Sequence, residues 1–410
     1  MAVVTKVGSF LCQASTGNFA VSGLGFTPKA ILFWGNGQSL DGSTASASGP
    51  IAALGPYWGM AVSASSQVAI AYGDDFATGS GITFDTISAC IISRTATTNR
   101  FAASLVTMDV DGFTVNFSIA NATAYPINYF AFGGADLTVA IKAVVTPTTT
   151  GPFAVTGVGF KPDAQIAIGI DAISGTEGYA LGLASGSTKR GALAAGFDAT
   201  AVGGVQRNNK VWTVVRGSAG VVREADLTSF DTDGFTWNFN AAPAQASTVY
   251  TLNFKGGQYS VGTFLQKTSA GSQAYTGVGF QPVGLLCLTG GFTAGAAVNT
   301  TEQNTMTGAA SSASARAVVY YGSGAAGVAE LDRTAIYSDR ADNSSGTLNA
   351  KADLTSLDPD GFTLNYSSAD AVAREVIYFA VGNPAGPRTA PWNMVESGIR
   401  PRPFAPGIGR

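Results

Sequence analysis

Histidine is absent from this 410-residue chain, and cysteine is scarce. Without an imidazole, neither a Ser-His-Asp nor a Cys-His nucleophilic system can be assembled, and histidine-ligated zinc is excluded as well. The three cysteines, Cys12, Cys90 and Cys287, lie far apart and outside any Cys-x-x-Cys pattern. They indicate neither a disulfide framework nor a zinc site, so we expect buried free thiols.

Charge is also low, because charged residues make up only 12% of the chain and the formal net charge is -3. Soluble globular proteins typically contain about twice that fraction. No basic stripe is present, so we expect no nucleic-acid partner. No apolar run approaches the roughly 20 residues of a membrane-spanning helix, and residues 1–6 do not begin a secretory signal. We therefore expect no membrane partner and no export by that route.

What the chain does have is an internal repeat. A Gly-x-Gly-Phe-x-Pro motif ends at Pro28 and recurs at residues 157–162 and 277–282. An Asp-x-Asp-Gly-Phe-Thr motif follows it each time, and a closing strand headed by Tyr129, Tyr250 or Tyr378 comes about 20 residues later. These anchors divide the chain into units 1–138, 139–257 and 258–382. Each unit has the length of an ordinary domain and should own a core.

Within each unit the patterns indicate β-strands. The runs 30–34, 164–168 and 284–288 are short, apolar and bounded by glycine or proline, as in buried strands. Residues 115–117 and 236–239 alternate apolar and polar side chains, which is typical of a strand with one buried face. Phe113, Phe235 and Phe362 recur at one place in the repeat, as core residues do. The sequence therefore predicts an all-β chain of three tandem β-sandwich domains of the jelly-roll kind.

The composition changes at residue 383, where a proline- and arginine-rich segment begins and runs to residue 410. Proline fixes φ and removes amide donors, so this C-terminal arm should be extended rather than paired in a sheet. Its arginines and apolar anchors are of the types that bind partners, and the alternative is a terminus without a role. The candidate partner-binding residues are Arg388, Trp392, Arg400, Arg402, Phe404 and Arg410.

The Asp-x-Asp-Gly motif is the most chemical-looking feature, since paired carboxylates beside a glycine resemble the opening of a calcium loop. Position twelve of such a loop needs glutamate, but Ala120, Ala242 and Ala369 stand there. A tight turn into a strand, with its glycine at positive φ, is the better interpretation. The candidate cation ligands are Asp109, Asp111, Asp231, Asp233, Asp358 and Asp360.

Catalysis and cofactor binding find little support. Glycoside hydrolysis needs two opposed carboxylates, and no acidic pair keeps its place in all three repeats. Gly73-Asp74-Asp75 occurs only once and suits a turn. No phosphate-binding or dinucleotide-binding loop is present, so we expect no cofactor and no enzyme. Tyr57, Trp58 and Trp392 do not recur and are candidate contact-surface residues.

Residues 25–33, 109–117 and 129–134 carry a family resemblance, with their counterparts in the other units. This combination resembles the β-sandwich repeats of tailed-bacteriophage structural proteins. The second unit departs from it at residues 250–254, and the third lacks the final Gly-Gly.

The resemblance implies a virion protein, assembled in the host cytoplasm, whose partners are other capsid or tail subunits. It favours a capsid decoration or cement protein. A tail- or fibre-associated adhesin that binds cell-surface glycans is the alternative, and a carbohydrate-active enzyme is the third candidate. It supplies no catalytic residue, and it leaves open a homotrimer and a bound glycan.

Overall fold

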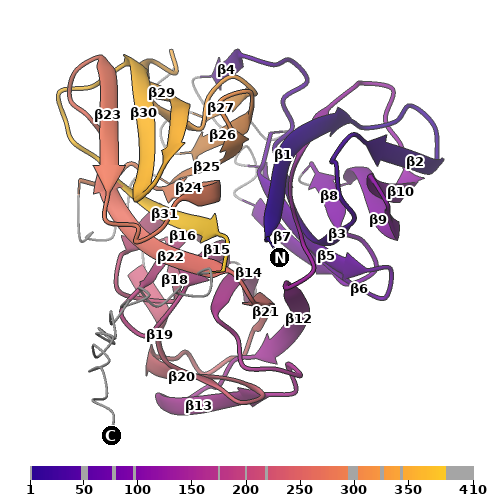
Figure 1. Cartoon of the computed structure of the whole chain (residues 1–410), viewed down its shortest axis with the longest axis vertical. Helices are drawn as coiled ribbons and strands as arrows, with labels where there is room; N and C mark the ends of the chain where they lie inside the picture. The colour runs from indigo at the N-terminus through magenta and orange to yellow at the C-terminus, as the bar shows by residue number, and fades with distance from the viewer. Residues whose placement is uncertain are drawn as a thin grey trace, which may run out of the picture.

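A computed structural model of the chain describes residues 2–47, 54–75, 80–95, 98–173, 176–198, 201–217, 220–293, 303–323, 327–341 and 345–384. Every element in these residues is a β-strand, and the sheets are antiparallel. The strands form three sandwiches in tandem, each with a large sheet and a four-stranded sheet (Figure 1). The prediction of an all-β chain with three tandem sandwich domains is confirmed.

In the first repeat the large sheet has the order β1-β11-β3-β5-β6-β7 and the small sheet has the order β2-β10-β9-β8. The first strand thus pairs with the last and the second with the last but one, which is the nested part of a jelly roll. The strands are β1 (Val4–Leu11), β2 (Gly17–Ser22), β3 (Pro28–Gly35), β4 (Ser43–Ala47), β5 (Tyr57–Ser63), β6 (Ser66–Asp75), β7 (Ser80–Thr86), β8 (Ile91–Arg94), β9 (Asn99–Asp109), β10 (Gly112–Ile119) and β11 (Pro126–Gly133).

The second repeat follows the same plan, with sheets β12-β21-β14-β15-β16-β17 and β13-β20-β19-β18. Its strands are β12 (Thr138–Val145), β13 (Gly151–Thr156), β14 (Ala164–Ile173), β15 (Thr176–Ala184), β16 (Arg190–Asp198), β17 (Ala201–Arg207), β18 (Trp212–Arg216), β19 (Gly220–Asp231), β20 (Gly234–Ala241) and β21 (Thr248–Lys255).

In the third repeat the large sheet has the order β22-β31-β24-β25-β26-β27-β4, and the small sheet β23-β30-β29-β28. Its seventh strand, β4, comes from the first repeat. The third repeat's own strands are β22 (Gln258–Leu265), β23 (Gly271–Thr276), β24 (Pro282–Thr289), β25 (Gln303–Ser312), β26 (Ala315–Ser323), β27 (Gly327–Asp332), β28 (Tyr337–Arg340), β29 (Leu348–Asp358), β30 (Gly361–Ser368) and β31 (Glu375–Gly382).

Each sandwich has its own apolar core between its two sheets. Phe113, Phe235 and Phe362 occupy equivalent places there and are fully buried, as the repeat predicts. A fourth core was not expected from the sequence. It lies where the outer faces of the three large sheets meet, and residues of all three repeats contribute to it. We call this shared core the hub.

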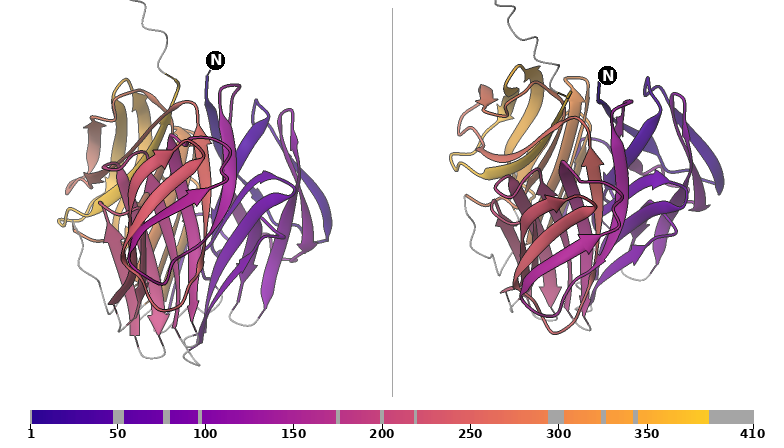
Figure 2. Two further views of the ribbon diagram at one scale, coloured as in Figure 1. Left: turned by 90° about the horizontal axis from the view of Figure 1, so that it is seen from below. Right: turned by 60° about the horizontal axis from the view of Figure 1, so that its bottom comes forward.

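The three sandwiches are arranged around the hub, with the small sheets outermost (Figure 1). Seen from the side, they stand next to one another, with the N-terminus at one end (Figure 2). Rings from different repeats meet at the hub, where the centroid of Phe254 lies 5.1 Å from that of Phe132 and 5.9 Å from that of Phe379. The molecule therefore has an approximate threefold arrangement within one chain.

The packing between repeats is cyclic. Strand β1 lies against β25 and β26 of the third repeat, β22 lies against β15 and β16 of the second, and β12 lies against β5 of the first. The amide of Val7 donates to Ser311 Oγ at 2.9 Å, and the amide of Val261 donates to Ser185 Oγ at 2.9 Å. A head-to-tail contact of this kind closes into a ring when the rotation suits it.

The Gly-Gly pairs that end the first two repeats lie where the chain passes to the next repeat. A Cβ on Gly134, whose φ is +113°, would lie 2.2 Å from the carbonyl oxygen of Ala2. A Cβ on Gly256, with φ of +87°, would lie 2.2 Å from the oxygen of Asp136. The third repeat ends in Gly382-Asn383 instead.

The closing strands do not align on tyrosine as predicted. Tyr129 and Tyr378 are equivalent and point into their own sandwiches, but the residue in register with them in β21 is Thr251. Tyr250 stands one position earlier, so its side chain points to the opposite face and into the hub. Its hydroxyl donates to Asp85 Oδ2 at 2.7 Å, which joins the first and second repeats.

Candidate functional site

The two repeated sequence motifs form one structural unit. In each repeat the second aspartate of Asp-x-Asp-Gly accepts hydrogen bonds from both glycine amides of the Gly-x-Gly-Phe loop. In the second repeat, Asp233 Oδ2 accepts from Gly157 N at 3.0 Å and Oδ1 from Gly159 N at 2.6 Å. Asp111 and Asp360 hold the corresponding glycines in the same way. We call these three contacts the aspartate clamps.

The first aspartate of each motif accepts from two hydroxyls on its own hairpin. Asp231 Oδ1 accepts from Ser229 at 2.6 Å and Oδ2 from Thr236 at 2.7 Å, and Asp109 and Asp358 have matching partners. All six candidate cation ligands are thus engaged with the protein itself. Within the described ranges no group of three or more histidine, cysteine, aspartate or glutamate side chains is placed to hold a metal ion.

The turn interpretation matches the structure, because the hairpin from β9 to β10 turns through residues 110 and 111. The predicted positive φ is present in the second and third repeats, with +150° at Gly234 and +158° at Gly361, but not in the first. Gly112 has no positive φ, but a Cβ there would lie 1.9 Å from the carbonyl oxygen of Val21. Gly234 and Gly361 meet Val155 and Tyr275 in the same way. Close approach of the neighbouring strand therefore excludes a side chain.

The clamp has an electrostatic consequence at Asp233. The amides of Gly159 and Gly157 hold the pKa of this carboxyl below its ordinary value, and Lys142 adds to the effect. Hydrogen bonds to a carboxylate favour its charged form. This carboxylate is suited to orient a loop rather than to transfer a proton near neutral pH.

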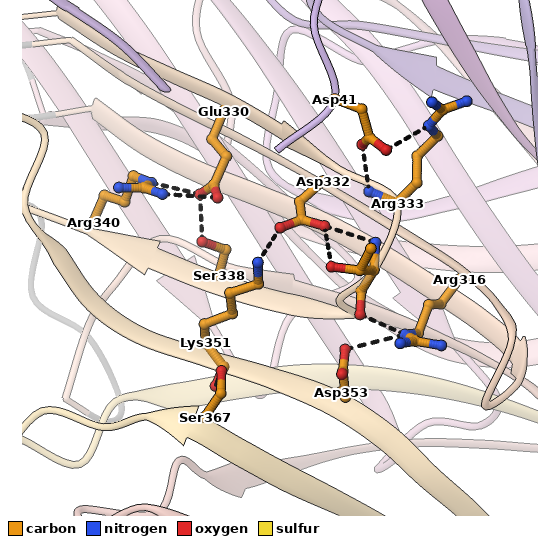
Figure 3. Close-up of polar contacts among 11 residues, drawn as sticks. Asp41, Arg316, Glu330, Asp332, Arg333, Ser338, Arg340, Lys351, Asp353 and Ser367 are labelled. Carbon is orange, nitrogen blue, oxygen red and sulfur yellow. Dashed lines mark hydrogen bonds and ion pairs between the residues drawn. The ribbon is translucent and has the colours of Figure 1, made fainter. Parts of the chain in front are cut away.

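A cluster of buried charge lies in the third repeat, beside the strand that the first repeat supplies (Figure 3). Glu330 is 1% exposed and binds Arg340 through Nε at 2.5 Å and Nη2 at 2.8 Å. Asp332 is 2% exposed and binds Lys351 and the hydroxyl of Thr334. Burial by itself raises the pKa of Asp332. Lys351 and Thr334 lower this pKa by more than burial raises it, so the net shift is downward.

Neither of these carboxylates is arranged for catalysis. A general acid or base needs a pKa near the working pH and a free path to substrate. Asp332 is held ionised, and both oxygens of Glu330 already accept hydrogen bonds from Arg340 or Ser338. Glu330 and Asp332 instead hold β27, the strand of the third repeat's large sheet with which β4 pairs.

The first repeat reaches this edge through a polar loop. Backbone pairing joins β4 to β27 from Ser43 opposite Leu331 to Ala47 opposite Gly327. The buried amide of Asn36 donates to the carbonyl oxygens of Tyr320 at 3.3 Å and Glu330 at 3.0 Å. Asp41 forms an ion pair with Arg333 at 3.1 Å. The first repeat therefore donates a strand to the third repeat in addition to packing against it.

A cavity of about 340 Å³ opens at this same boundary. Its charged lining residues are Lys6 and Asp41 from the first repeat and Arg316 and Arg333 from the third. Arg316 donates to Asp353 and to the carbonyl oxygen of Thr334, and Arg333 pairs with Asp41. Two of the three cationic side chains, Arg316 and Arg333, are thus paired within the protein. We therefore interpret the cavity as a polar gap between two repeats rather than as an anion-binding site.

Two further sequence expectations meet different outcomes. The three cysteines are free and buried as predicted, and burial raises the thiol pKa of Cys12, Cys90 and Cys287. The suggestion that Tyr57 and Trp58 form a contact surface is wrong, because they are 0% and 2% exposed. Trp58 contacts Tyr179 across the hub at 4.9 Å between ring centroids and donates to Thr307 Oγ1 at 3.1 Å.

The candidate partner-binding residues of the arm lie outside the described residues, which end at Pro384. They are Arg388, Trp392, Arg400, Arg402, Phe404 and Arg410. The side chains of Asp74 and Asp75 are likewise outside them. No helix within the described ranges is long and apolar enough to cross a membrane.

Comparison with known proteins adds no relative. No protein-family profile matches the chain, and no curated protein matches it either.

Proposed function

We propose that this protein is a structural component of a bacteriophage virion, a decoration or cement protein that binds the assembled shell. The approximate threefold body built from one chain carries the proposal. Icosahedral shells present local threefold positions, and a body with three similar outward faces makes three similar contacts there. A single chain of this kind replaces a homotrimer, so one copy occupies one position.

Two other observations support a passive, durable role. The aspartate clamps and the paired carboxylates are used to hold loops and strands, which is a structural use of charge. The hub and the strand exchange make the repeats mutually dependent. A cement protein gains from such rigidity, because ordering costs on binding are then small.

In this proposal the arm contacts neighbouring shell subunits. The arm begins beside the hub, where Gln258 Nε2 donates to the carbonyl oxygen of Asn383 at 2.6 Å. Its arginines suit carboxylates on a neighbour, and its aromatic residues suit apolar pockets.

The experiment compares the full chain with a chain that ends at Asn383, using particles that lack the protein. We expect only the full chain to sediment with the particles. Full binding by the shortened chain would overturn the role of the arm. Antibody labelling of whole particles then tests the position, since label on the tail rather than the shell would replace the cement role with the adhesin role.

A further inference from the structure

The third repeat has an open cleft. It lies between β22 and β23, at the side where the two sheets of the sandwich part, and has a volume of about 370 Å³. Phe264, Phe362 and Tyr378 form its floor, each less than 10% exposed, and Leu265 stands at its rim with 51% exposed. None of the described residues that line it is charged.

The side chains beside the cleft differ between the repeats. In the first repeat, Phe19 of β2 stacks on Phe10 with centroids 5.8 Å apart. Phe153 holds the same position in β13, but Gln273 holds it in β23 and points to solvent.

Tyr275 replaces the valine of the other two repeats and packs on Phe264 with centroids 4.3 Å apart. Its hydroxyl donates to the carbonyl oxygen of Leu265 at 3.0 Å and pairs with the hydroxyl of Tyr366 at 2.8 Å.

The chemistry of the cleft favours an uncharged, apolar occupant on an extended segment. Pockets of this volume with an aromatic lining bury large apolar side chains well. The adjoining strand β23 is an edge strand that carries neither proline nor charge, the devices that usually protect edges.

We propose that the chain's own C-terminal arm covers this cleft and that Trp392 enters it. The described chain ends at Pro384, next to the start of β22. The cleft lies seven residues further along β22, a distance of roughly 23 Å at about 3.3 Å per residue. Trp392 lies eight residues beyond Pro384, and an extended proline-rich segment spans about 25 Å over that length. Reach and side-chain type agree.

This inference concerns the free protein and does not rest on the proposed virion role. In the free chain the arm is stored on the third repeat, and a neighbour that binds the arm must displace it.

Tryptophan fluorescence tests the proposal on the full chain, because the other four tryptophans, Trp34, Trp58, Trp212 and Trp237, are buried. The signal of Trp392 is obtained by subtracting a Trp392→Phe variant. We expect acrylamide to quench Trp392 severalfold less in the full chain than in a synthetic peptide of residues 384–410.

Two variants change the cleft by independent means. Gln273→Phe with Tyr275→Val and Tyr366→Phe gives the third repeat the set of side chains that packs in the first. Leu265→Arg places a charge at the exposed rim, where folding is unaffected. Both should raise the quenching of Trp392 to that of the peptide. Ser272→Phe, which adds a ring on the opposite face of β23, should leave it unchanged.

Quenching in the native chain that equals the peptide's, or that neither variant changes, would overturn the proposal. Protection that disappears on dilution would assign the arm to a second copy and overturn the intrachain contact. These measurements use free protein, so their failure leaves the particle-binding test of the proposed function intact.

Discussion

Asp111, Asp233 and Asp360 each organise a loop that lies 74 to 88 residues earlier in the chain. One carboxylate accepts two amides whose glycines adopt positive φ, a conformation that other residues rarely take. The loop is thereby fixed at the point where the chain enters the buried strand of the large sheet. A pair of motifs that looks chemical in the sequence is a long-range structural contact.

The first prediction concerns this clamp. Asp233→Asn should lower the melting temperature at neutral pH, because the amide group cannot accept hydrogen bonds from both Gly157 and Gly159. The folded-state pKa of Asp233 is depressed, so the stabilisation is present above the unfolded pKa of about 3.9 and is lost as pH falls through the folded value. Melting curves of both proteins should therefore converge below about pH 4. Thr232→Ala, at the exposed position between the two aspartates, serves as the control, and a constant gap down to the lowest pH would contradict the mechanism.

A second prediction follows from a glycine and a tyrosine on neighbouring strands. A Cβ on Gly8 would lie 2.3 Å from Tyr129 Oη, and a Cβ on Gly262 would lie 2.5 Å from Tyr378 Oη. The second repeat has Lys142 and Thr251 at these positions. Gly8→Ala should destabilise the protein by about 1–3 kcal/mol through overpacking. In a Tyr129→Thr background the same change should cost much less, and strictly additive free energies of unfolding would sink this account.

At the level of elements, the distinguishing feature is the strand that the first repeat gives to the third. Asn36 is fully buried and supplies two backbone carbonyls of the third repeat with a donor. Buried carbonyls that lose their partner are costly. The loop from β3 to β4 is therefore fixed by specific polar contacts as well as by the ladder between β4 and β27.

We expect Asn36→Ala to lower the free energy of unfolding by about 1–3 kcal/mol. Hydrogen exchange should also speed up at the amides of β27. Asn18→Ala is the control, because it removes a hydrogen bond at an exposed site. Asn116 Nδ2 donates this bond to Asn18 Oδ1 at 2.7 Å. Denaturant titration of both variants provides the comparison, and equal losses would show that the buried contact has no special weight.

At the level of the whole molecule, the hub decides how the repeats behave together. Each repeat has its own core, but the outer face of each large sheet is buried only by the other two repeats. We expect the full chain to unfold in one calorimetric transition, with equal calorimetric and van't Hoff enthalpies. An isolated second repeat should expose its hub face and self-associate, which sedimentation can measure. Three separate transitions would contradict the dependence.

Much of this fold could be predicted, because the motifs recur in order and spacing along the chain. The runs 30–34 and 284–288 of the large sheets are apolar without a break, whereas residues 115–117 and 236–239 of the small sheets alternate. An unbroken apolar run indicates a sheet covered on both faces, so a signal of the hub was present. Which repeat covers which face, and where β4 pairs, could not be predicted, since strands 43–47 and 327–332 share no motif. The cleft could not be predicted either, because its lining residue Tyr275 is matched with Val21 and Val155 only once the strand register is known.

Strand β4 can pair with its partner only late in the synthesis of the chain. Residues 43–47 are synthesised some 280 residues before the edge of β27 that receives them. At roughly 5–20 residues per second, the ribosome takes about 14–56 s to supply that partner. Throughout this interval the first repeat carries a strand without its ladder, and a chain that stops before residue 332 never closes the ring. The first repeat therefore reaches its final structure only after the last repeat has been synthesised.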